Sequence, residues 1–492
     1  MDFVAHTKAL IVGSGGNGIS PAVYFKRAGI DDFLIISKHS DFGGTWFQNT
    51  YPGCEVDVPS ELYQLSYAVT GDWSAVYARQ PELLTYLQKV AADNDLYRHA
   101  HFGTEMTGAD WLGGENCWEV RTTQGTYHAD FLLLATGYLE EAVLPRIPGR
   151  DAFEGRLFHS SQWPDGYTGE GEHVAVIGTG SSGMQIVSEL QKHACAVTVF
   201  QRTPTWVLPK RNEKLALEDH ERVHEAAAAA AAHRGETFSR REKAWSDVIT
   251  GQGLAKNEEL AREFLEAQVG DPELRALLTP RHRFGCKRTL YSDDYFTALQ
   301  QPNVRIVPEA AVGIGASTIT AASGAEIEAD TIVFATGFHF GGHVLARVKR
   351  RDGRTVAEVQ AGHPQAYKSV SVAGCPNLFL IGGPAPNGQI WHGMFAGEAT
   401  ARYLLAAFDF MAENGVLALE VDEAAEAGWK RRADAILDNG PVVAGGCTNY
   451  SQDELGHNKA AWPGSVRDMA EALSTFDASA YRVVARSAAP AT

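Results

Sequence analysis

Residues 173–185 read HVAVIGTGSSGMQ, and this stretch decides the fold. An apolar run is followed by Gly178, Gly180 and Gly183 in the spacing G-x-G-x-x-G. Between a strand and a helix, the first glycine permits a tight turn and the second lets the backbone approach a pyrophosphate. The third lets helix and strand pack closely. The stretch therefore predicts a strand–turn–helix unit that binds a dinucleotide.

The next strand ends in VTVFQRTPTW (197–206), with Arg202 and Thr203 at its end. A site that binds NAD carries Asp or Glu here, which bonds to the ribose 2′-hydroxyl. An arginine suits a 2′-phosphate instead and predicts NADP. The alternative is that Arg202 is a solvated charge at a strand end.

A second glycine motif lies near the N-terminus, where residues 9–12 form an apolar run. The same spacing follows at Gly13, Gly15 and Gly18. With the apolar strand FLII (33–36), this motif predicts another βαβ unit for a dinucleotide. Pro21 falls in the expected helix, where it removes a backbone hydrogen bond and would allow a kink.

The strand FLII runs into Ser37, Lys38 and His39. A carboxylate that binds the ribose is expected at this point, about 20 residues beyond the glycines. A serine offers one neutral hydrogen bond where a carboxylate accepts two charge-assisted ones. The loss in cofactor binding is on the order of 1–3 kcal/mol. The alternative is that other contacts compensate.

Two distant strands repeat one pattern, HADFLLLATGY (128–138) and EADTIVFATGF (328–338). Each is an apolar strand that ends in Ala-Thr-Gly, with backbone exposed beside a ligand. The repeat predicts two similar nucleotide-binding domains, each closed by one of these strands. Further patterns predict a helix over 81–98 and strands near 118–122 and 377–382. Residues 211–280 are rich in Ala, Glu and Arg and predict helices that shape a substrate cleft.

Composition excludes several classes of protein. The 492 residues include 43 basic and 60 acidic ones, a net charge of −17, which argues against a nucleic-acid or anionic-membrane surface. Six cysteines are spread without a CxxC pair, so we expect neither zinc nor a disulfide framework. No apolar run approaches the roughly 20 residues that span a bilayer, and the first strand starts too early for a signal peptide. We expect a cytoplasmic protein without a metal. The pattern does not indicate an oligomeric state.

Two irregular stretches carry the most specific patterns. FEGRLFHSSQWP (153–164) joins the two halves, with Phe153, Gly155, His159, Trp163 and Pro164 as its fixed positions. GGTWFQNTYPGCEVD (43–57) is too aromatic for a solvated loop. Its rings would suit a flat aromatic ligand, and the alternative is an ordinary buried loop.

Together these stretches resemble the type I Baeyer–Villiger monooxygenases, a branch of the flavin-containing monooxygenases. The first fits their pattern F-x-G-x-x-x-H-x-x-x-W-P, and the second fits G-G-x-W-x-x-x-x-Y-P-G-x-x-x-D. The resemblance implies an α/β fold with two Rossmann-like dinucleotide-binding domains. An FAD domain would comprise 1–144 and 372–492, an NADP domain 145–210 and 286–371, and a helical insertion 211–285.

The resemblance also implies a set of site residues. FAD would be held by Gly13, Gly15, Gly18, Gly44, Thr45, Trp46, Asp57 and Tyr63. NADPH would be held by Gly178, Thr179, Gly180, Ser181, Ser182, Gly183, Gln185, Arg202, Thr203 and Lys287, with Arg202 and Lys287 on the 2′-phosphate. Arg288 would keep a flavin C4a-peroxide deprotonated and stabilise its adduct with a ketone, and Asp57 would hold Arg288 in place. His159 and Trp163 would couple the two domains.

The implied activity inserts one oxygen atom of O2 next to a ketone carbonyl, giving an ester or lactone at the expense of NADPH. One alternative is oxygenation of sulfur or nitrogen on the same scaffold, which needs the protonated peroxide. Another is a non-catalytic relative that binds NADP. The chain departs from the family pattern at Ser37, at Ser369, where a glycine is expected, and at Asn449, where many relatives carry a lid tryptophan.

Overall fold

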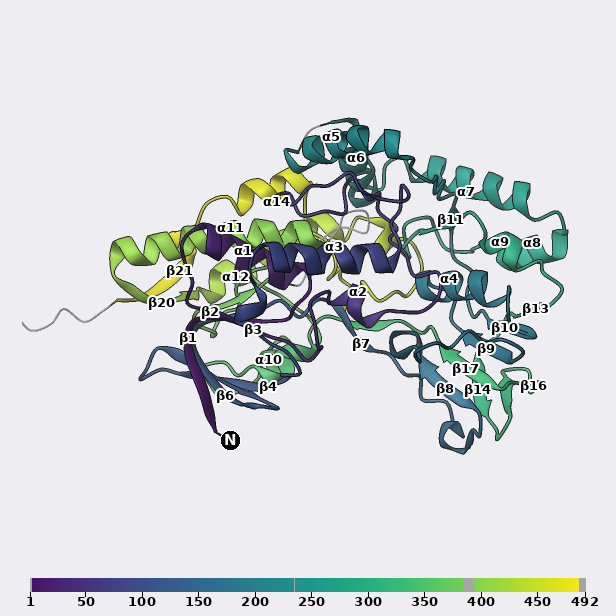
Figure 1. Ribbon diagram of the computed structural model, residues 1–492, viewed down its shortest axis with the longest axis horizontal. Coiled ribbons are helices and arrows are strands. Elements are labelled where there is room, and N and C mark those ends of the chain that lie inside the picture. Colours follow the sequence, from purple (N-terminus) through teal and green to yellow (C-terminus); the bar gives the residue numbers. More distant parts are fainter. Residues whose placement is uncertain (1, 234, 384–392, 486–492) are drawn as a thin grey trace, which may run out of the picture.

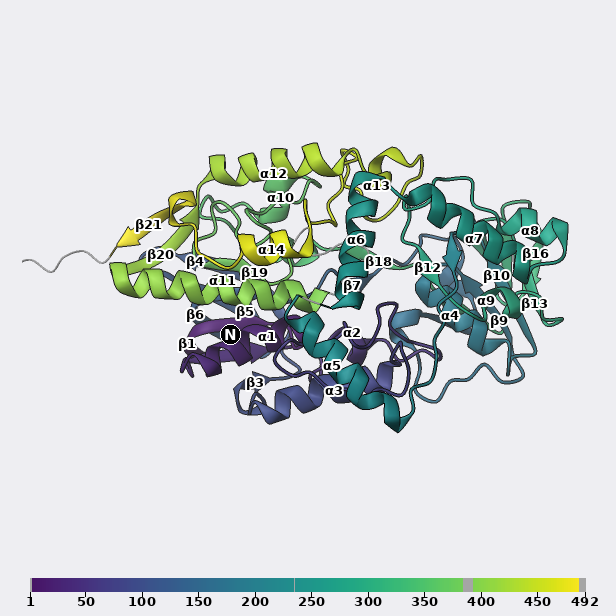
Figure 2. The ribbon, with the colours of Figure 1, turned by 90° about the horizontal axis from the view of Figure 1, so that it is seen from above.

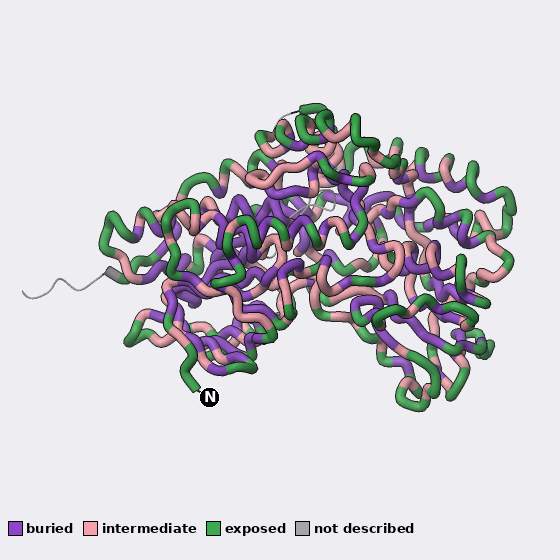
Figure 3. The backbone as a smooth tube through the Cα atoms, in the orientation of Figure 1, coloured by how far each residue is buried: buried purple, intermediate pink, exposed green. Residues whose placement is uncertain are grey.

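The computed structural model describes residues 2–233, 235–383 and 393–485, and it has two lobes (Figure 1). Each lobe is built on its own sheet, and helices cover both. The buried residues follow the strands and the inner faces of the helices, whereas residues on the outer helix faces are exposed (Figure 3). No helix in the described part of the chain is long and apolar enough to cross a bilayer.

The first sheet forms the core of the first lobe and has seven strands. Their order is β3-β2-β1-β6-β5-β4, and β19 also pairs with β6. The bounds are β1 (Phe3–Val12), β2 (Phe33–Ile36), β3 (Ala100–His101), β4 (Met106–Leu112), β5 (Cys117–Thr122), β6 (Gly125–Leu134) and β19 (Leu378–Leu380). The start of β6 pairs antiparallel with β5, and its end pairs parallel with β19. A segment from late in the chain thus completes a sheet begun at the N-terminus.

The second sheet is parallel and has five strands, in the order β13-β10-β9-β17-β8. The bounds are β8 (Arg156–His159), β9 (His173–Ile177), β10 (Ala196–Phe200), β13 (Val304–Val307) and β17 (Thr331–Phe334). A small antiparallel sheet lies in the same lobe and comprises β14 (Ala311–Ile314), β15 (Thr318–Ala321) and β16 (Glu326–Glu328). Strands β9 and β17 are almost entirely apolar, as expected for strands buried on both faces.

The chain crosses between the lobes through two short strands, β7 (Leu139–Ala142) and β18 (Phe338–Phe340). They follow the two Ala-Thr-Gly turns and pair with each other in an antiparallel ribbon. Figure 2 shows this ribbon between the lobes.

Helices α1 (Gly16–Arg27) and α11 (Gly393–Asn414) pack against each other in the first lobe, and α4 (Ser181–Leu190) opens the second. The predicted helical insertion contains α5 (His220–Ala231), α6 (Glu236–Thr250), α7 (Leu254–Gln268) and α8 (Pro272–Leu278). Figures 1 and 2 place α5 and α6 over the middle of the molecule and α7 and α8 over the second lobe. The remaining helices and strands include α2 (Thr45–Gln48), α3 (Gln80–Asp93), α9 (Tyr295–Ala298), α10 (Val356–Gln360), α12 (Glu423–Leu437), α13 (Pro441–Ala444), α14 (Val466–Ala472), β11 (Val207–Leu208), β12 (Leu290–Tyr291), β20 (Val416–Val421) and β21 (Tyr481–Ala485).

One local prediction, the extent of a helix, differs from the structure. The helix predicted over 81–98 ends at Asp93, because Asp95 adopts a left-handed φ of 55° that breaks the helical path. Helix α1 continues through Pro21 to Arg27. Ser369, where a glycine was expected, has a φ of 60°, the left-handed conformation that glycine favours.

Candidate functional site

The predicted site residues gather around one cavity of about 1460 Å³ that is lined by both lobes. This volume exceeds the roughly 300–1,000 Å³ of an ordinary small-molecule pocket and leaves space for two large ligands. The lining includes Gly13, Gly15, Gly44, Thr45, Trp46, Asp57, Tyr63, Gly178, Thr179, Gly180, Ser181, Ser182, Gln185, Arg202, Thr203, Lys287 and Arg288.

The third glycine of each motif does not line the cavity. A Cβ atom at Gly18 would overlap the carbonyl oxygen of Gly13, and one at Gly183 would overlap that of Gly178. Their role is therefore the close packing of helix on strand. The sequence placed both among the cofactor-binding residues, and the structure places them one layer behind.

Each glycine loop leaves a helix N-terminus open toward the cavity. The N-cap residues of α1 and α4 are Gly15 and Gly180, and neither has a side chain that could cap the first amides. A Cβ atom at Gly180 would meet no other atom within 4 Å, so there is free space beside the helix start. Free amides at a helix start attract a phosphate, and both loops fit a dinucleotide.

The stretch 43–57 lies against the first glycine loop. A Cβ atom at Gly44 would approach the Cα of Gly15 to 2.7 Å, so only glycine fits there. Farther along the cavity, the indole Nε1 of Trp46 donates to the hydroxyl of Tyr63 at 3.3 Å, and the two rings meet edge to face. This stretch therefore presents an aromatic wall that suits a flat ring system.

Ser37 at the end of β2 is buried, and its hydroxyl lies 2.8 Å from that of Ser14 in the glycine loop. Lys38, next in the chain, forms an ion pair with Glu140 on the connecting ribbon, and His343 also contacts Glu140 at 2.5 Å. Burial and the charge of Lys38 lower the pKa of His39 to about 4. A carboxylate is thus present at this end of the cavity, but it comes from β7 instead of β2.

Arg202 and Lys287 form the cationic end of the second lobe. Burial and the nearby charge of Arg202 lower the pKa of Lys287, which shows that the two cations lie close together. Within the described residues neither forms an ion pair with a carboxylate. Two adjacent cations without acidic partners fit a dianionic 2′-phosphate.

Asp57 and Arg288 form a charged pair where the two lobes meet in the cavity. Arg288 donates from Nε and Nη2 to Oδ2 of Asp57, at 2.9 and 2.6 Å. Burial by itself would raise the pKa of Asp57, but the charge and hydrogen bonds of Arg288 lower it, as do the charges of Lys210 and Arg241. The Asp57 carboxylate in turn raises the pKa of Arg288, despite the opposing effect of burial. Arg288 is a fixed cation whose direction is set by Asp57.

Sequence reasoning missed some side chains around this pair. Arg241 lies on α6 in the insertion, to which the sequence assigned no chemistry. Tyr138 and Tyr450 lie near Arg288 and line the same cavity. Tyr138 follows an Ala-Thr-Gly turn that the sequence did highlight, whereas nothing in the local pattern indicates Arg241.

A hydrogen-bonded seam ties the stretch 43–57 to α4. The hydroxyl of Tyr51 donates to Gln185 at 3.1 Å and accepts from Ser182 at 3.1 Å. Gln185 also donates from Nε2 to the carbonyl of Glu55 at 3.1 Å. Tyr51 belongs to the Tyr-Pro-Gly turn of the predicted motif, but its contact across the lobes could not be read from the sequence.

The motif at 153–164 acts on the crossing between the lobes. His159 is fully buried and bonds through Nε2 to the carbonyl oxygen of Gly337, which directly precedes β18. Trp163 packs on Phe158 and donates to the carbonyl of Tyr167, inside the second lobe. His159 thus supports the strand that crosses between the lobes. Trp163, which was also expected to couple the domains, contacts Phe158 and Tyr167 of its own lobe.

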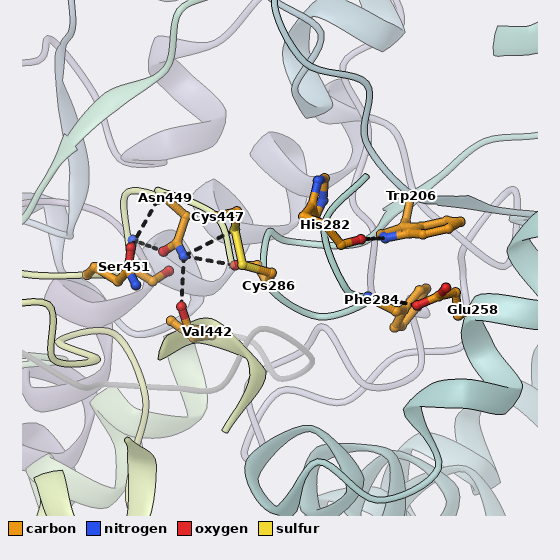
Figure 4. Close-up of a disulfide and its surroundings, with 10 residues drawn as sticks. Trp206, Glu258, His282, Phe284, Cys286, Val442, Cys447, Asn449 and Ser451 are labelled. Atoms are coloured by element: carbon orange, nitrogen blue, oxygen red, sulfur yellow. Dashed lines mark hydrogen bonds between the residues drawn. A yellow bond between two sulfur atoms is a disulfide. The ribbon is translucent and has the colours of Figure 1, made fainter. Parts of the chain in front are cut away.

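The structure contradicts one prediction about the cysteines. Cys286 and Cys447 form a disulfide, with a sequence separation of 161 and their Cα atoms 6.1 Å apart (Figure 4). Sequence spacing could not show this, because the fold alone brings the two segments together. Cys54, Cys117, Cys195 and Cys375 are free thiols.

Residues 10–239 match the family model described as pyridine nucleotide-disulphide oxidoreductase. The chain is 36% identical over 487 residues to a Baeyer-Villiger monooxygenase of Streptomyces coelicolor. The aligned region covers 97% of this chain and 93% of the relative.

Solved structures show the same similarity. A structure of OTEMO in complex with FAD and NADP superposes with a TM-score of 0.88 at 25% identity, covering 97% of this chain and 99% of the other. Cyclohexanone monooxygenase bound to ε-caprolactone gives a TM-score of 0.84 at 28% identity, covering 98% and 100%.

Proposed function

The chain belongs to the Baeyer–Villiger monooxygenase family, and on that basis we propose that it is an FAD- and NADPH-dependent enzyme that inserts one oxygen atom of O2 next to a ketone carbonyl. The product is an ester or lactone. The observation that carries the proposal is the Asp57–Arg288 pair, which lies in one cavity with both glycine loops.

We propose that FAD occupies the first lobe and NADPH the second. The first glycine loop, Thr45, Trp46 and Tyr63 would hold FAD. The second loop would hold NADPH with Gln185 and Thr203, and Arg202 and Lys287 would bind its 2′-phosphate. The domain ranges follow as residues 1–144 and 372–492 for FAD, 145–210 and 286–371 for NADP, and 211–285 for the insertion. Residues 1, 384–392 and 486–492 of the FAD range and residue 234 of the insertion lie outside the described residues.

When bound, the flavin accepts hydride from NADPH and activates O2. The role of Arg288 is electrostatic. A guanidinium cannot give up its proton at any relevant pH, so Arg288 stays positive throughout the reaction. A fixed cation in a cavity of low dielectric stabilises negative charge that develops on a ketone oxygen. Asp57 accepts two hydrogen bonds from Arg288 and so prevents the guanidinium from turning away.

This charge decides between the two oxygenation reactions. Attack on a ketone carbonyl needs a nucleophilic, negatively charged oxidant, whereas sulfur or nitrogen oxygenation needs a neutral, electrophilic one. A permanent cation favours the negatively charged form. The pair therefore supports ketone oxygenation over the heteroatom reaction, and two open glycine loops oppose a non-catalytic role.

The substrate would be a ketone, since the structurally similar cyclohexanone monooxygenase is bound to a lactone. We also propose a cytoplasmic location, where a soluble NADPH supply exists.

The test uses the purified protein and a panel of ketones and sulfides. We expect a yellow protein that consumes NADPH and O2 and forms an ester or lactone, detected by gas chromatography with mass spectrometry. A protein that cannot be loaded with FAD would refute the enzyme assignment. Sulfoxide formation without an ester or lactone from any ketone would support the heteroatom reaction instead.

A further inference from the structure

The Cys286–Cys447 disulfide joins two segments that both line the cavity (Figure 4). Cys286 directly precedes Lys287 and Arg288, which are cavity residues. Cys447 directly precedes residues 448–451, which form another part of the cavity wall. The crosslink therefore connects the segment that carries Lys287 and Arg288 to a loop from near the C-terminus.

Hydrogen bonds reinforce this connection, and most of them involve Asn449. Its Nδ2 donates to the carbonyl oxygen of Cys286 at 2.9 Å and to that of Val442 at 3.1 Å, and its Oδ1 accepts from the amide of Ser451 at 2.9 Å. The backbone amide of Arg283 also donates to the carbonyl of Gly445 at 3.2 Å. Asn449 thus fastens the loop to the same residue that the disulfide holds.

The backbone is shaped so that the two segments can touch. A Cβ atom at Gly445 would lie 2.6 Å from the Cβ of Cys286 and 2.9 Å from its sulfur. Gly285 has a φ of 80° and faces Pro441, where an added Cβ would lie 3.0 Å from Cγ. A side chain at either glycine would push the two cysteines apart.

The loop of residues 445–451, which the disulfide and Asn449 hold in place, also extends to the region around Arg288. The ring of Tyr450 stacks on Phe340 of the crossing strand β18, with ring centres 5.8 Å apart, and Tyr450 lies near Arg288 on the wall of the same cavity. Movement of the loop would therefore disturb the positions of Arg288, Lys287 and the strand that crosses between the lobes.

We propose that Cys286, Cys447 and Asn449 are positioning residues that hold residues 445–451 against Lys287 and Arg288, so that the reduced, uncrosslinked protein binds NADP more weakly. The inference rests on the proposed function, because it assigns Lys287 to the 2′-phosphate. The crosslink opens when a dithiol supplies two electrons and two protons. The S–S bond breaks, two S–H bonds form, and the dithiol becomes a disulfide.

The first test counts thiols in the purified holoenzyme. Alkylation of the denatured, unreduced protein followed by mass spectrometry should label four cysteines, and all six after reduction. Labelling of all six without reduction would overturn the proposal.

The second test measures NADP⁺ binding to the oxidised holoenzyme and to the same protein after dithiothreitol, by isothermal titration calorimetry. If the loop occupies its place in about a tenth of the reduced molecules, the Kd rises about tenfold. The flavin absorbance should not change, and protease should cut within 445–451 only after reduction. An unchanged Kd together with an unchanged cleavage pattern would contradict the proposal.

Variants separate positioning from general stability. Cys447→Ser should reproduce the weaker binding and lose its response to dithiothreitol, and the KM for NADPH should rise more than kcat falls. Cys195→Ser is the matched control, because Cys195 is an exposed free thiol outside the cavity. Asn449→Ala should weaken binding mainly in the reduced protein, where the crosslink no longer supports the loop.

The closing experiment distinguishes this inference from the proposed function. NADP⁺ binding and proteolysis need no ketone. A protein whose NADP⁺ affinity follows its disulfide but which oxygenates no ketone would retain the inference and refute the function. A ketone oxygenase whose NADP⁺ affinity ignores the disulfide would do the reverse.

Discussion

In the first lobe, Gly13 has a φ of 119°, and a Cβ there would overlap the carbonyl oxygen of Ala135. In the second lobe, Gly178 has a φ of 112°, and a Cβ would overlap the carbonyl oxygen of Ala335. The two phosphate loops are therefore near copies in backbone and in their contact with an Ala-Thr-Gly turn. They differ at the end of the next strand, where the first lobe has Ser37 and the second has Arg202. We therefore expect the repeated backbone to bind the pyrophosphate that two dinucleotides share, and the residue at the strand end to distinguish the two dinucleotides.

The largest expected effect comes from breaking each loop in turn. Gly13→Ala should remove FAD, and Gly178→Ala should leave a yellow protein that NADPH no longer reduces, because each Cβ would overlap the carbonyl oxygen of Ala135 or Ala335 and so distort the tight turn that shapes the phosphate loop. Flavin content and anaerobic reduction measure the two outcomes, with circular dichroism as a check on folding. Equal loss of FAD in both variants would mean that the lobes do not divide the cofactors as proposed.

Substitutions of Arg288 test the site where the two lobes meet. Arg288→Ala should retain FAD and its reduction by NADPH but lower ester or lactone formation by about 10²–10³-fold, since one stabilising cation is removed. Arg288→Lys keeps the charge without the two-pronged contact to Asp57 and should recover part of the rate. Product formation by Arg288→Ala at the wild-type rate would refute the assigned role.

Arg202 tests the second strand end. Arg202→Ala should raise the KM for NADPH by roughly 10–100-fold, as expected for a lost charged hydrogen bond, and leave the KM for NADH nearly unchanged. Steady-state kinetics with both coenzymes measure this difference. An equal rise in the KM for NADPH and for NADH would show that Arg202 does not bind the 2′-phosphate.

Ser37 tests the first strand end and should give the smallest effect. Ser37→Glu restores a ribose carboxylate and should tighten FAD by up to about 1–3 kcal/mol, seen as slower flavin loss during dialysis. Ser37→Gln is the neutral control of matched length. A Glu variant that holds FAD less tightly would indicate that Glu140, beside Lys38, already performs this role and repels a second carboxylate.

The sequence predicted what depends on neighbours in the chain. The glycine loops, strand FLII and the two Ala-Thr-Gly turns follow local backbone requirements, and the first two glycines of each loop line the cavity with both turns, whereas Gly18 and Gly183 do not. The sequence did not predict contacts between segments that are distant in the chain. The Tyr51–Gln185 seam, the Arg241 charge beside Asp57 and the Cys286–Cys447 bond arise only when the lobes close on each other, so no local pattern announces them. Asn449 illustrates both cases. The sequence shows that it replaces the tryptophan of many relatives, but it does not show that the side chain bonds to Cys286 and Val442.

The pairing of β19 with the end of β6 has a consequence for the order in which the protein forms. All strands of the second sheet lie between residues 156 and 334, so this sheet can be complete while later segments are still being synthesised. The first sheet starts at Phe3 but waits for Leu378–Leu380 and for α11, which packs on α1. Such long-range pairing is slow to form and leaves apolar surface exposed meanwhile. The first lobe can therefore complete its sheet only after the second lobe has all of its strands, although its own first strand leaves the ribosome earlier.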